Sequence, residues 1–573
     1  MFSGDALELS GEKRLTVFGL LIGCALISLD PNLVGIVTPE LATDLKATSL
    51  YGWIAGAYLI ALTVSVPIVG KAVEVYSVRK IYLGSMIVFL IGTALCALAP
   101  EIHTFLASRV VQGLGAGGIF STNFAVAAVL FSPRAQGVIL SYFNIASGLA
   151  MVAGAVVGGM LADYTTWRAA FWANFVPGLF TFILLSLKMP EVPSKGEATM
   201  DFQGAFTLLG WCAPLMILCS WSPAEANDSL ALGALVALFV LCLVAFLRIE
   251  SRRRHPLLDP KLLKKPTSRW GALAAWTVGA FTTSAMVYVP LFAVEGQDLS
   301  ATDSSSLLVC QTVFAIGGSV AGGRILLRFG KYKPMMLIGT LVCTLLLFWM
   351  AERLSLQTPF WELMLVMAGL GTSFGIVMPL YPLAVQNSVD PERVASASSA
   401  VQFFQMLGSS MGAALTGLLL STSLNASFPD LVNPKVEAGL MVGREGGYAE
   451  KQSLEDQLKA NIENLREALQ EARAGNVHAE KDLRENPFVP ESLRAKLLND
   501  QPLDEKELQR ELTKLASELT VLIDDVVDNT IIAALHRVYL AIAALGLLTF
   551  VLTLLIPSLP LRADKAEDEA HPS

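Results

Sequence analysis

Long apolar segments separated by short polar ones dominate the pattern of hydrophobic and polar positions along this chain. A segment of about 20 apolar residues is long enough to cross a bilayer as a helix. Fourteen segments reach this length, at residues 15–38, 51–72, 81–99, 104–130, 137–160, 169–187, 203–221, 229–247, 270–293, 305–327, 335–352, 361–384, 395–421 and 531–557. Because most connections between them are short, the pattern predicts an all-α bundle of membrane-spanning helices.

One connection departs from this pattern, between the last two predicted spans. Residues 429–530 are polar and rich in helix-forming residues. Their apolar positions form a heptad seam at Leu508, Leu512, Leu515, Leu519, Leu522 and Val526, and a second stripe at Leu454, Leu458, Ile462, Leu465 and Leu469. The two stripes predict a helical hairpin insert. This hairpin either packs only on itself or docks a partner, such as a periplasmic adaptor protein.

The composition agrees with a membrane protein that has many spans. The chain is 54% hydrophobic and only 16% charged, whereas soluble domains contain about 25% charged residues. All seven cysteines lie in apolar segments without metal-site spacing, so we expect small buried hydrophobic residues rather than a metal site. The N-terminal residues 1–14 do not resemble a cleavable signal, so the first apolar segment is expected to remain as a span.

The distribution of lysine and arginine predicts the orientation in the membrane. These residues gather in the loops after even-numbered spans, for example at Lys80, Arg134, Lys195, Arg252, Lys331 and Arg393. Cytoplasmic loops carry an excess of Lys and Arg. Both termini are therefore expected in the cytoplasm, and the insert outside it. The basic run Arg252–Arg254 suits the inner lipid surface better than nucleic acid, so no nucleic-acid partner is expected.

Asp30 is the most informative single residue, because it is a carboxylate inside the first apolar segment. Such a group costs about 2.5–3.5 kcal/mol at the centre of a membrane helix and usually serves a function. The alternative is an acid that only pins two helices together. At 1.5 Å per residue, Asp30 and Arg109 lie roughly 12 Å and 8 Å from the outer ends of their spans. These depths predict an interaction, direct or through Gln112 or water, and Pro31 and Asn32 add polarity beside Asp30.

Two loops echo each other and predict a duplicated architecture. Residues 70–80 follow the second span and residues 323–331 follow the tenth, and both begin with glycine and end in basic residues. The first copy contains an acid and two cations: Glu74, Arg79 and Lys80. The second has Leu327 at the acid position but keeps Arg328. Repeated halves related by an axis along the membrane normal are typical of one class of secondary transporter.

Several short motifs occur in a characteristic order. They are Leu29-Asp30, Trp53, Tyr58, the 70–80 loop, Arg109 with Gln112-Gly113 and Gly115, Gly154-Ala155 with Gly158-Gly159, Trp167-Arg168, and Asn174 with Pro177. In order and spacing they resemble the major facilitator superfamily, and more narrowly its fourteen-span drug:proton antiporters. The resemblance covers nearly the whole chain except the insert. In those antiporters a proline usually stands where this chain has Ala155.

The resemblance implies a major facilitator fold with two six-helix halves and two extra central helices. The expected parts are 1–188 (N-terminal half), 202–247 (extra helices), 270–421 and 531–557 (C-terminal half), 429–530 (extracytoplasmic insert) and 558–573 (cytoplasmic tail). The residues themselves and the resemblance together predict the site residues. Proton coupling and substrate contact fall to Asp30, Arg109, Gln112 and Asn32; a conformational latch to Gly70, Glu74, Arg79, Lys80 and Arg328; and helix packing to the antiport-motif residues Gly154, Gly158 and Gly159.

The sequence contains no catalytic constellation and no phosphate-binding loop, so neither an enzyme nor an ATP-driven pump is predicted, and no cofactor. The predicted function is a proton-coupled exporter of lipophilic small molecules, cations among them, in a bacterial cytoplasmic membrane. Its expected partners are the small-molecule substrate, protons and membrane lipids. Two alternatives stay open: an exporter of a lipid, siderophore or other amphiphilic metabolite, and a transport-inactive sensor or scaffold that acts through the insert.

Overall fold

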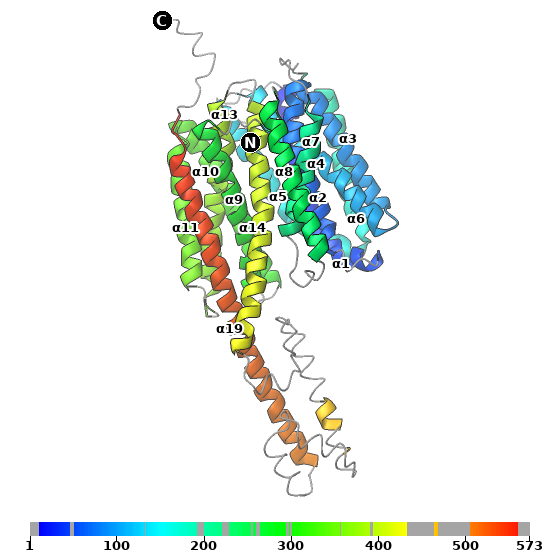
Figure 1. The fold of residues 1–573 in the computed structure, drawn as a ribbon, viewed down its shortest axis with the longest axis vertical. Helices are drawn as coiled ribbons and strands as arrows, with labels where there is room; N and C mark the ends of the chain where they lie inside the picture. The colour runs from blue at the N-terminus through cyan, green and yellow to red at the C-terminus, as the bar shows by residue number, and fades with distance from the viewer. Residues whose placement is uncertain are drawn as a thin grey trace.

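The computed structural model shows a helical bundle with a long arm projecting from one end (Figure 1). It describes residues 11–45, 51–131, 133–191, 200–219, 229–253, 256–258, 264–293, 297, 301–353, 355, 357–389, 394–431, 463–467, 471 and 505–559. No strand occurs among them, and fourteen of their helical stretches are long and apolar enough to cross a membrane. The predicted all-α fold class and the fourteen spans are confirmed.

The helices follow the apolar segments closely. They are α1 (Gly11–Asp44), α2 (Tyr51–Val75), α3 (Val78–Leu98), α4 (Ile102–Leu130), α5 (Pro133–Tyr164), α6 (Trp167–Lys188), α7 (Phe202–Cys219), α8 (Ser229–Arg252), α9 (Pro266–Leu291), α10 (Ala301–Phe329), α11 (Lys333–Arg353), α12 (Phe360–Val377), α13 (Leu380–Ser388), α14 (Val394–Leu431) and α19 (Glu505–Leu555). We call the end of the bundle where α2 passes into α3 the inner end, and the opposite end the outer end.

The two halves pack their helices in the same way. In the N-terminal half, α1 packs on α5 and α6, and α2 packs on α4. In the C-terminal half, α9 packs on α14 and α19, and α10 packs on α12. The two echoing loops differ where their first helix ends: Gly330 has a φ of 63° and donates its N–H to the carbonyl of Leu326 at 2.8 Å, whereas Ser77 at the corresponding position has a φ of −58°. Glycine adopts this left-handed conformation without steric cost.

The twelfth span differs from the single helix expected from its hydropathy. It consists of α12 and the short α13, separated at Met378 and Pro379. Proline has no N–H to donate to the preceding turn, so a helix normally ends or bends there. Pro382 lies in the first turn of α13, where its missing N–H costs little.

The extra helices α7 and α8 form a pair against the rest of the bundle. α8 packs on α7, and α7 packs on both α2 and α14, so the pair reaches one helix of each half. The Trp211 ring of α7 lies between Phe246 of α8 and Phe403 of α14, with centroid distances of 6.0 and 6.1 Å. α8 is otherwise largely exposed, as expected for a helix that faces lipid.

The last span and the arm of the insert form one continuous helix, α19, which leaves the bundle at its outer end (Figure 1). Leu512 on this arm and Leu465 in the short helical stretch 463–467 are both buried and share one apolar cluster. Each of the two predicted apolar stripes therefore has one leucine in this cluster. Most of the predicted hairpin, including residues 432–462 and 472–504, lies outside the described residues.

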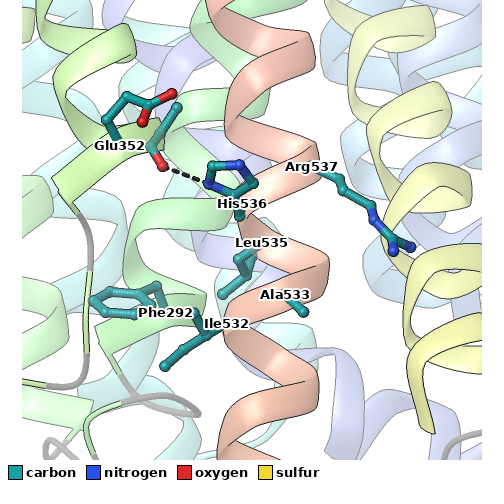
Figure 2. A pocket seen from close by; sticks show the side chains of 8 residues that line it. Phe292, Glu352, Ile532, Ala533, Leu535, His536 and Arg537 are labelled. Atoms are coloured by element: carbon teal, nitrogen blue, oxygen red, sulfur yellow. Dashed lines mark hydrogen bonds between the residues drawn. The ribbon is translucent and has the colours of Figure 1, made fainter. Parts of the chain in front are cut away.

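A cavity of about 380 Å³ lies at the outer end where α19 enters the bundle. Figure 2 shows Phe292 after α9, Glu352 of α11, and Ile532 and His536 of α19 around it. The Nδ1 atom of His536 lies 2.6 Å from the carbonyl oxygen of Ala351, which ties α19 to α11.

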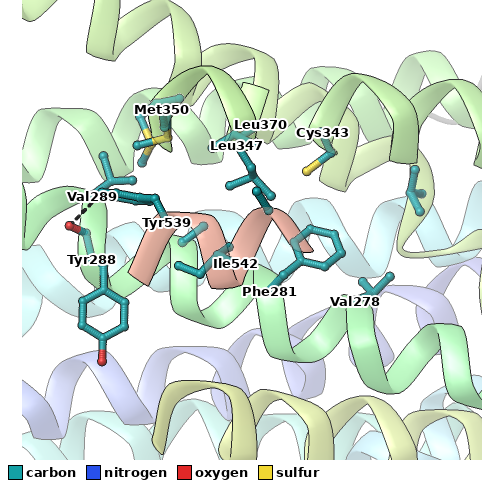
Figure 3. Close-up of a cluster of buried hydrophobic side chains, with 14 of the residues drawn as sticks. Val278, Phe281, Tyr288, Val289, Cys343, Leu347, Met350, Leu370, Tyr539 and Ile542 are labelled. Carbon is teal, nitrogen blue, oxygen red and sulfur yellow. Dashed lines mark hydrogen bonds between the residues drawn. The ribbon is translucent and has the colours of Figure 1, made fainter. Parts of the chain in front are cut away.

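Apolar side chains of α9, α11, α12 and α19 fill the core of the C-terminal half (Figure 3). Phe281, Leu347 and Ile542 are buried there, and the Tyr539 hydroxyl donates a 2.8 Å hydrogen bond to the backbone carbonyl of Tyr288. A buried hydroxyl normally needs such a partner, because an unpaired one costs about 1–3 kcal/mol. This hydrogen bond fixes the depth of α19 relative to α9.

Candidate functional site

The Asp30 carboxylate is completely buried in the N-terminal half and accepts hydrogen bonds from three side chains. Its Oδ2 atom accepts from Arg109 Nη1 at 2.6 Å. Its Oδ1 atom accepts from Gln112 Nε2 at 2.8 Å and from Asn174 Nδ2 at 3.1 Å. The predicted interaction between Asp30 and Arg109 is therefore direct, and Gln112 strengthens it rather than replacing it.

Arg109 is held from several sides and is itself almost inaccessible. Its Nε donates to the carbonyl of Ile54 at 3.1 Å, and its Nη1 also donates to Gln112 Oε1 at 2.7 Å. The guanidinium lies 4.4 Å from the centroid of the Tyr58 ring, a cation–π distance. A buried ion pair is tolerated only when its remaining polar atoms are satisfied, and here the surrounding groups satisfy them.

The local sequence explains how these groups meet. Arg109 and Gln112 are three residues apart on α4, so they lie on the same face of that helix. Gly92 of α3 lies against the backbone of Gln112, where an added Cβ would approach its nitrogen to 2.3 Å. Gly113 lies equally close to Tyr58 of α2. These two glycines allow α2 and α3 to approach α4 and enclose the charged pair.

Asn174 of α6 is the site residue that the sequence interpretation did not assign. Its side chain is fully buried and donates to Asp30, although the two residues are 144 positions apart. The available signal was a lone amide in the apolar sixth span. Asn32, by contrast, lies outside the network: its side chain donates to the carbonyl of Ser28 at 3.3 Å and lies next to Gly154.

The charged residues of the 70–80 loop contact different parts of the N-terminal half. Glu74 Oε2 pairs with Lys71 Nζ at 2.6 Å, and both side chains are buried. Arg79 donates to the carbonyl of Ser186, and Lys80 lies 3.9 Å from Glu191 on the exposed surface. Glu74 thus pairs with a cation of its own helix, whereas Arg79 and Lys80 contact Ser186 and Glu191. One helical turn places Lys71 beside Glu74, and the two later cations lie on α3.

The remaining predicted latch residues lie in separate places. Arg328 stacks on the neighbouring Phe329 ring, with 5.6 Å between the guanidinium carbon and the ring centroid. Gly70 lies against α14 of the other half, where a Cβ would meet the hydroxyl of Ser399. Phe403, further along α14, is fully buried among side chains of the N-terminal half. The two halves are thus in close contact at the inner end.

Two of the three antiport-motif glycines bring α5 close to α1. A Cβ on Gly154 would lie 2.7 Å from the carbonyl oxygen of Leu29, and one on Gly158 would lie 3.2 Å from that of Leu33. Small residues permit such close approach between membrane helices. Gly159 differs, because nothing lies within 4 Å of the position of an added Cβ.

At the outer end, Asp44 joins the end of α1 to the start of α6. Its Oδ2 accepts hydrogen bonds from Trp167 Nε1 and from Arg168 Nη1, both at 2.9 Å. The Trp167 and Arg168 hydrogen bonds lower the pKa of Asp44 below its usual range. Among the residues that the structure describes, no group of three His, Cys, Asp or Glu side chains is arranged to hold a metal ion.

Comparison with known proteins agrees with this architecture. The chain is 28% identical over 431 residues to the multidrug transporter protein MdtP of Bacillus subtilis (strain 168). The aligned region covers 74% of this chain and 79% of that protein. It is 24% identical to multidrug resistance protein 3 of the same organism, over 73% of this chain and 82% of that protein.

Two solved structures share the fold. The human organic anion transporter MFSD10 matches with a TM-score of 0.53 at 16% identity, covering 72% of this chain and 94% of that one. The proton:xylose symporter XylE matches with a TM-score of 0.52 at 15% identity, covering 70% of this chain and 87% of that one. The family model of the Major Facilitator Superfamily matches residues 20–413, most of the chain. This chain therefore belongs to the major facilitator superfamily and is an integral, multi-pass membrane transporter.

Proposed function

We propose that the protein is a proton-coupled exporter of lipophilic, cationic small molecules that works by alternating access. The observation that carries this proposal is the sealed Asp30–Arg109 pair with Gln112 and Asn174 in the N-terminal half. The names of its relatives, a multidrug transporter and a multidrug resistance protein, support export of small molecules. We place it in a bacterial cytoplasmic membrane with both termini in the cytoplasm, because lysines and arginines gather in the loops at the inner end.

Proton binding at Asp30 would change the whole network. An ionised carboxylate only accepts hydrogen bonds, whereas a protonated one also donates. A proton on Asp30 would therefore remove the charge that holds Arg109 at 2.6 Å and would leave a buried guanidinium without its counterion. Arg109 would then move towards another acceptor or towards water. This exchange gives a physical link between protonation and helix movement, since the network joins α1, α4 and α6.

The inner end provides the second part of the cycle. Contacts of Gly70 with Ser399 and of Phe403 with the N-terminal half keep the inner end closed. The buried Lys71–Glu74 pair stands next to this contact, and we propose that Glu74, together with Gly70, stabilises this state. Cargo would leave towards the outer side while the inner end stays closed, and the inner end would open for reloading.

Transport in reconstituted vesicles tests the proposal. Purified protein in proteoliposomes with an internal pH dye is given tetraphenylphosphonium and a panel of other lipophilic cations. We expect cargo movement to drive opposite proton movement, and Asp30→Asn to abolish that coupling. Glu362→Gln, which alters an acid in the first turn of α12, is the matched control. Cargo transport by Asp30→Asn at the wild-type rate, with an unchanged proton signal, would disprove the mechanism.

The same panel distinguishes export of lipophilic cations from export of amphiphilic metabolites. If only lipids or iron chelates in this panel drove proton movement, the protein would be an exporter of amphiphilic metabolites.

We also propose that the arm formed by the outer part of α19 offers a docking surface to a periplasmic adaptor. Its continuity with the last span supports this proposal, because a force on the arm would reach the bundle through one helix.

A further inference from the structure

A second group of buried charges lies at the inner end, where α7 and α8 meet α2. We call it the inner charge cluster. It comprises Lys71 and Glu74 of α2, Asp201 before α7, Glu250 of α8 and Arg253 after α8. Lys71, Asp201 and Glu250 are buried, the Glu74 side chain is 9% exposed, and Arg253, at 47% exposure, reaches solvent. Among the described residues here, three carboxylates face two cations.

Asp201 and Glu250 approach each other around a glycine. The position of a Cβ on Gly204 lies 2.7 Å from Glu250 Oε1 and 3.1 Å from Asp201 Oδ2, so the two carboxylates share one small space. Only a residue without a side chain leaves this space free. Two like charges in a desolvated space repel each other, and a single proton between them removes the repulsion.

Each of the two carboxylates has one oxygen with a backbone donor and one without a hydrogen bond. Asp201 Oδ1 accepts from the Gly204 N–H at 2.9 Å, and Glu250 Oε1 accepts from the Leu257 N–H at 3.3 Å. Glu250 Oε2 and Asp201 Oδ2 accept no hydrogen bond from the described residues. The nearest charges only partly compensate: Arg253 Nε lies 3.5 Å from Asp201 Oδ2, and Lys71, which acts electrostatically on Glu250, already pairs with Glu74.

We propose that the carboxylates of Glu250 and Asp201 bind one proton between them when the inner end is closed, and release it when the inner end opens. The proton comes from the solution on the inner side and returns to it. In the protonated state one carboxyl group donates its O–H to an unpaired oxygen, which removes the uncompensated buried charge. The extra helices thus carry a proton site of their own, separate from Asp30.

The packing of α7 links this site to the contact between the halves. α7 contacts α2 and α14, and its Trp211 ring packs against Phe403 at 6.1 Å. Any movement that withdraws α14 from α2 at Gly70 and Ser399 also removes the cover from α7. Water would then solvate both carboxylates of Glu250 and Asp201 in their ionised form, and the shared proton would be released to the solution on the inner side. Proton binding therefore stabilises the closed inner end.

This inference does not depend on what the protein exports, because it concerns only proton binding at the inner end. Spin labels on Tyr76→Cys and Lys331→Cys, both exposed positions at the inner end, report the distance between the halves. The double-cysteine protein lacks the seven native cysteines and is studied in lipid nanodiscs without cargo. Distances are measured by electron paramagnetic resonance across a pH series from about 5 to about 9.

We expect the ratio of closed to open molecules of the otherwise unmodified protein to fall as the pH rises, by up to about tenfold per pH unit, the limit for one linked proton. Glu250→Gln should keep the inner end closed at every pH, because a neutral amide can donate to Asp201. Asp201→Asn should do the same, because its amide can donate to Glu250. Glu352→Gln, at the outer end, is the control and should leave the pH response intact.

Infrared difference spectra of the same samples supply a direct measure of the proton. A carboxylic-acid C=O band that is present at low pH and absent in Glu250→Gln supports the proposal. If the distance between the spin labels in the otherwise unmodified protein did not change with pH, the proposal would be overturned. A pH response that stays unchanged in both Glu250→Gln and Asp201→Asn would overturn it as well. The latter result would assign the response to another group, such as Asp30, while leaving proton-coupled export itself untouched.

Discussion

Arg109 Nη1 lies 2.6 Å from Asp30 Oδ2, and each side chain is only 1% exposed. The pair is therefore a neutral unit in a medium that excludes water. Removing one partner from such a pair typically costs about 3–5 kcal/mol, because the other charge stays buried and unpaired. Replacing both partners avoids that cost. Single and double variants of this pair therefore distinguish a loss of stability from a loss of the proton site.

We predict that Asp30→Asn lowers the stability of the protein by about 3–5 kcal/mol, whereas the double variant Asp30→Asn with Arg109→Gln is less affected. Both variants should lose proton-coupled transport. Stability is measured by thermal unfolding in detergent, and transport in proteoliposomes. If the double variant is as unstable as the single one, the guanidinium is not the cause of the loss.

Asn174→Ala tests the residue that sequence interpretation missed. The amide donates to a charged acceptor, and hydrogen bonds to charged groups contribute about 1.5–3 kcal/mol. We expect a loss of stability in this range and slower transport, because Asp30 loses one of its three donors. Asn174→Gln keeps the amide but shifts it by one methylene, so its stability and transport rate should lie between those of wild type and Asn174→Ala. Wild-type stability in Asn174→Ala would show that this hydrogen bond is dispensable.

Gly154→Ala and Gly159→Ala form a matched pair on one helix. The added methyl group would lie 2.7 Å from the Leu29 carbonyl at the first position and in open space at the second. Overpacking of this kind costs about 1–3 kcal/mol. We therefore expect Gly154→Ala to lower the melting temperature and transport, and Gly159→Ala to leave both near wild type. Equal effects would contradict a packing role specific to Gly154.

The Asp44 hydrogen bonds predict a pH dependence at the outer end. Because Trp167 and Arg168 lower the pKa of Asp44 in the folded protein, the contact stabilises the fold above about pH 4, the usual range of a free aspartate. This contribution is lost as the pH falls through the lowered pKa. Asp44 is half exposed, so we expect Asp44→Asn to cost less than about 1 kcal/mol at pH 7. The difference in stability between wild type and variant should disappear in acid, as followed by tryptophan fluorescence on unfolding.

Deleting residues 445–525 tests the role of the insert. The outer part of α19 lies outside the bundle, so we expect transport in proteoliposomes to continue without it (Figure 1). If the arm docks an adaptor, export from whole cells should fall while vesicle transport stays normal. Full export from cells that carry the deletion would reject a required docking role and leave the arm as a surface element.

The sequence by itself determined the spans, because apolarity over about 20 residues is a local property. It also predicted that Asp30 and Arg109 meet, since both lie at similar depth and each is costly alone. It missed the break at Pro379, although proline stood in the segment, because hydropathy does not register a lost N–H donor.

Only the tertiary structure decided which polar groups share a space. Asn174 reaches Asp30 across 144 residues, Lys71 rather than Arg79 pairs with Glu74, and Asp201 meets Glu250 only because α7 and α8 pack around Gly204. Hydropathy and spacing give the depth of a residue and the helix that carries it. The direction in which its side chain points depends on how that helix rotates to fill the space beside its neighbours, which long-range packing decides.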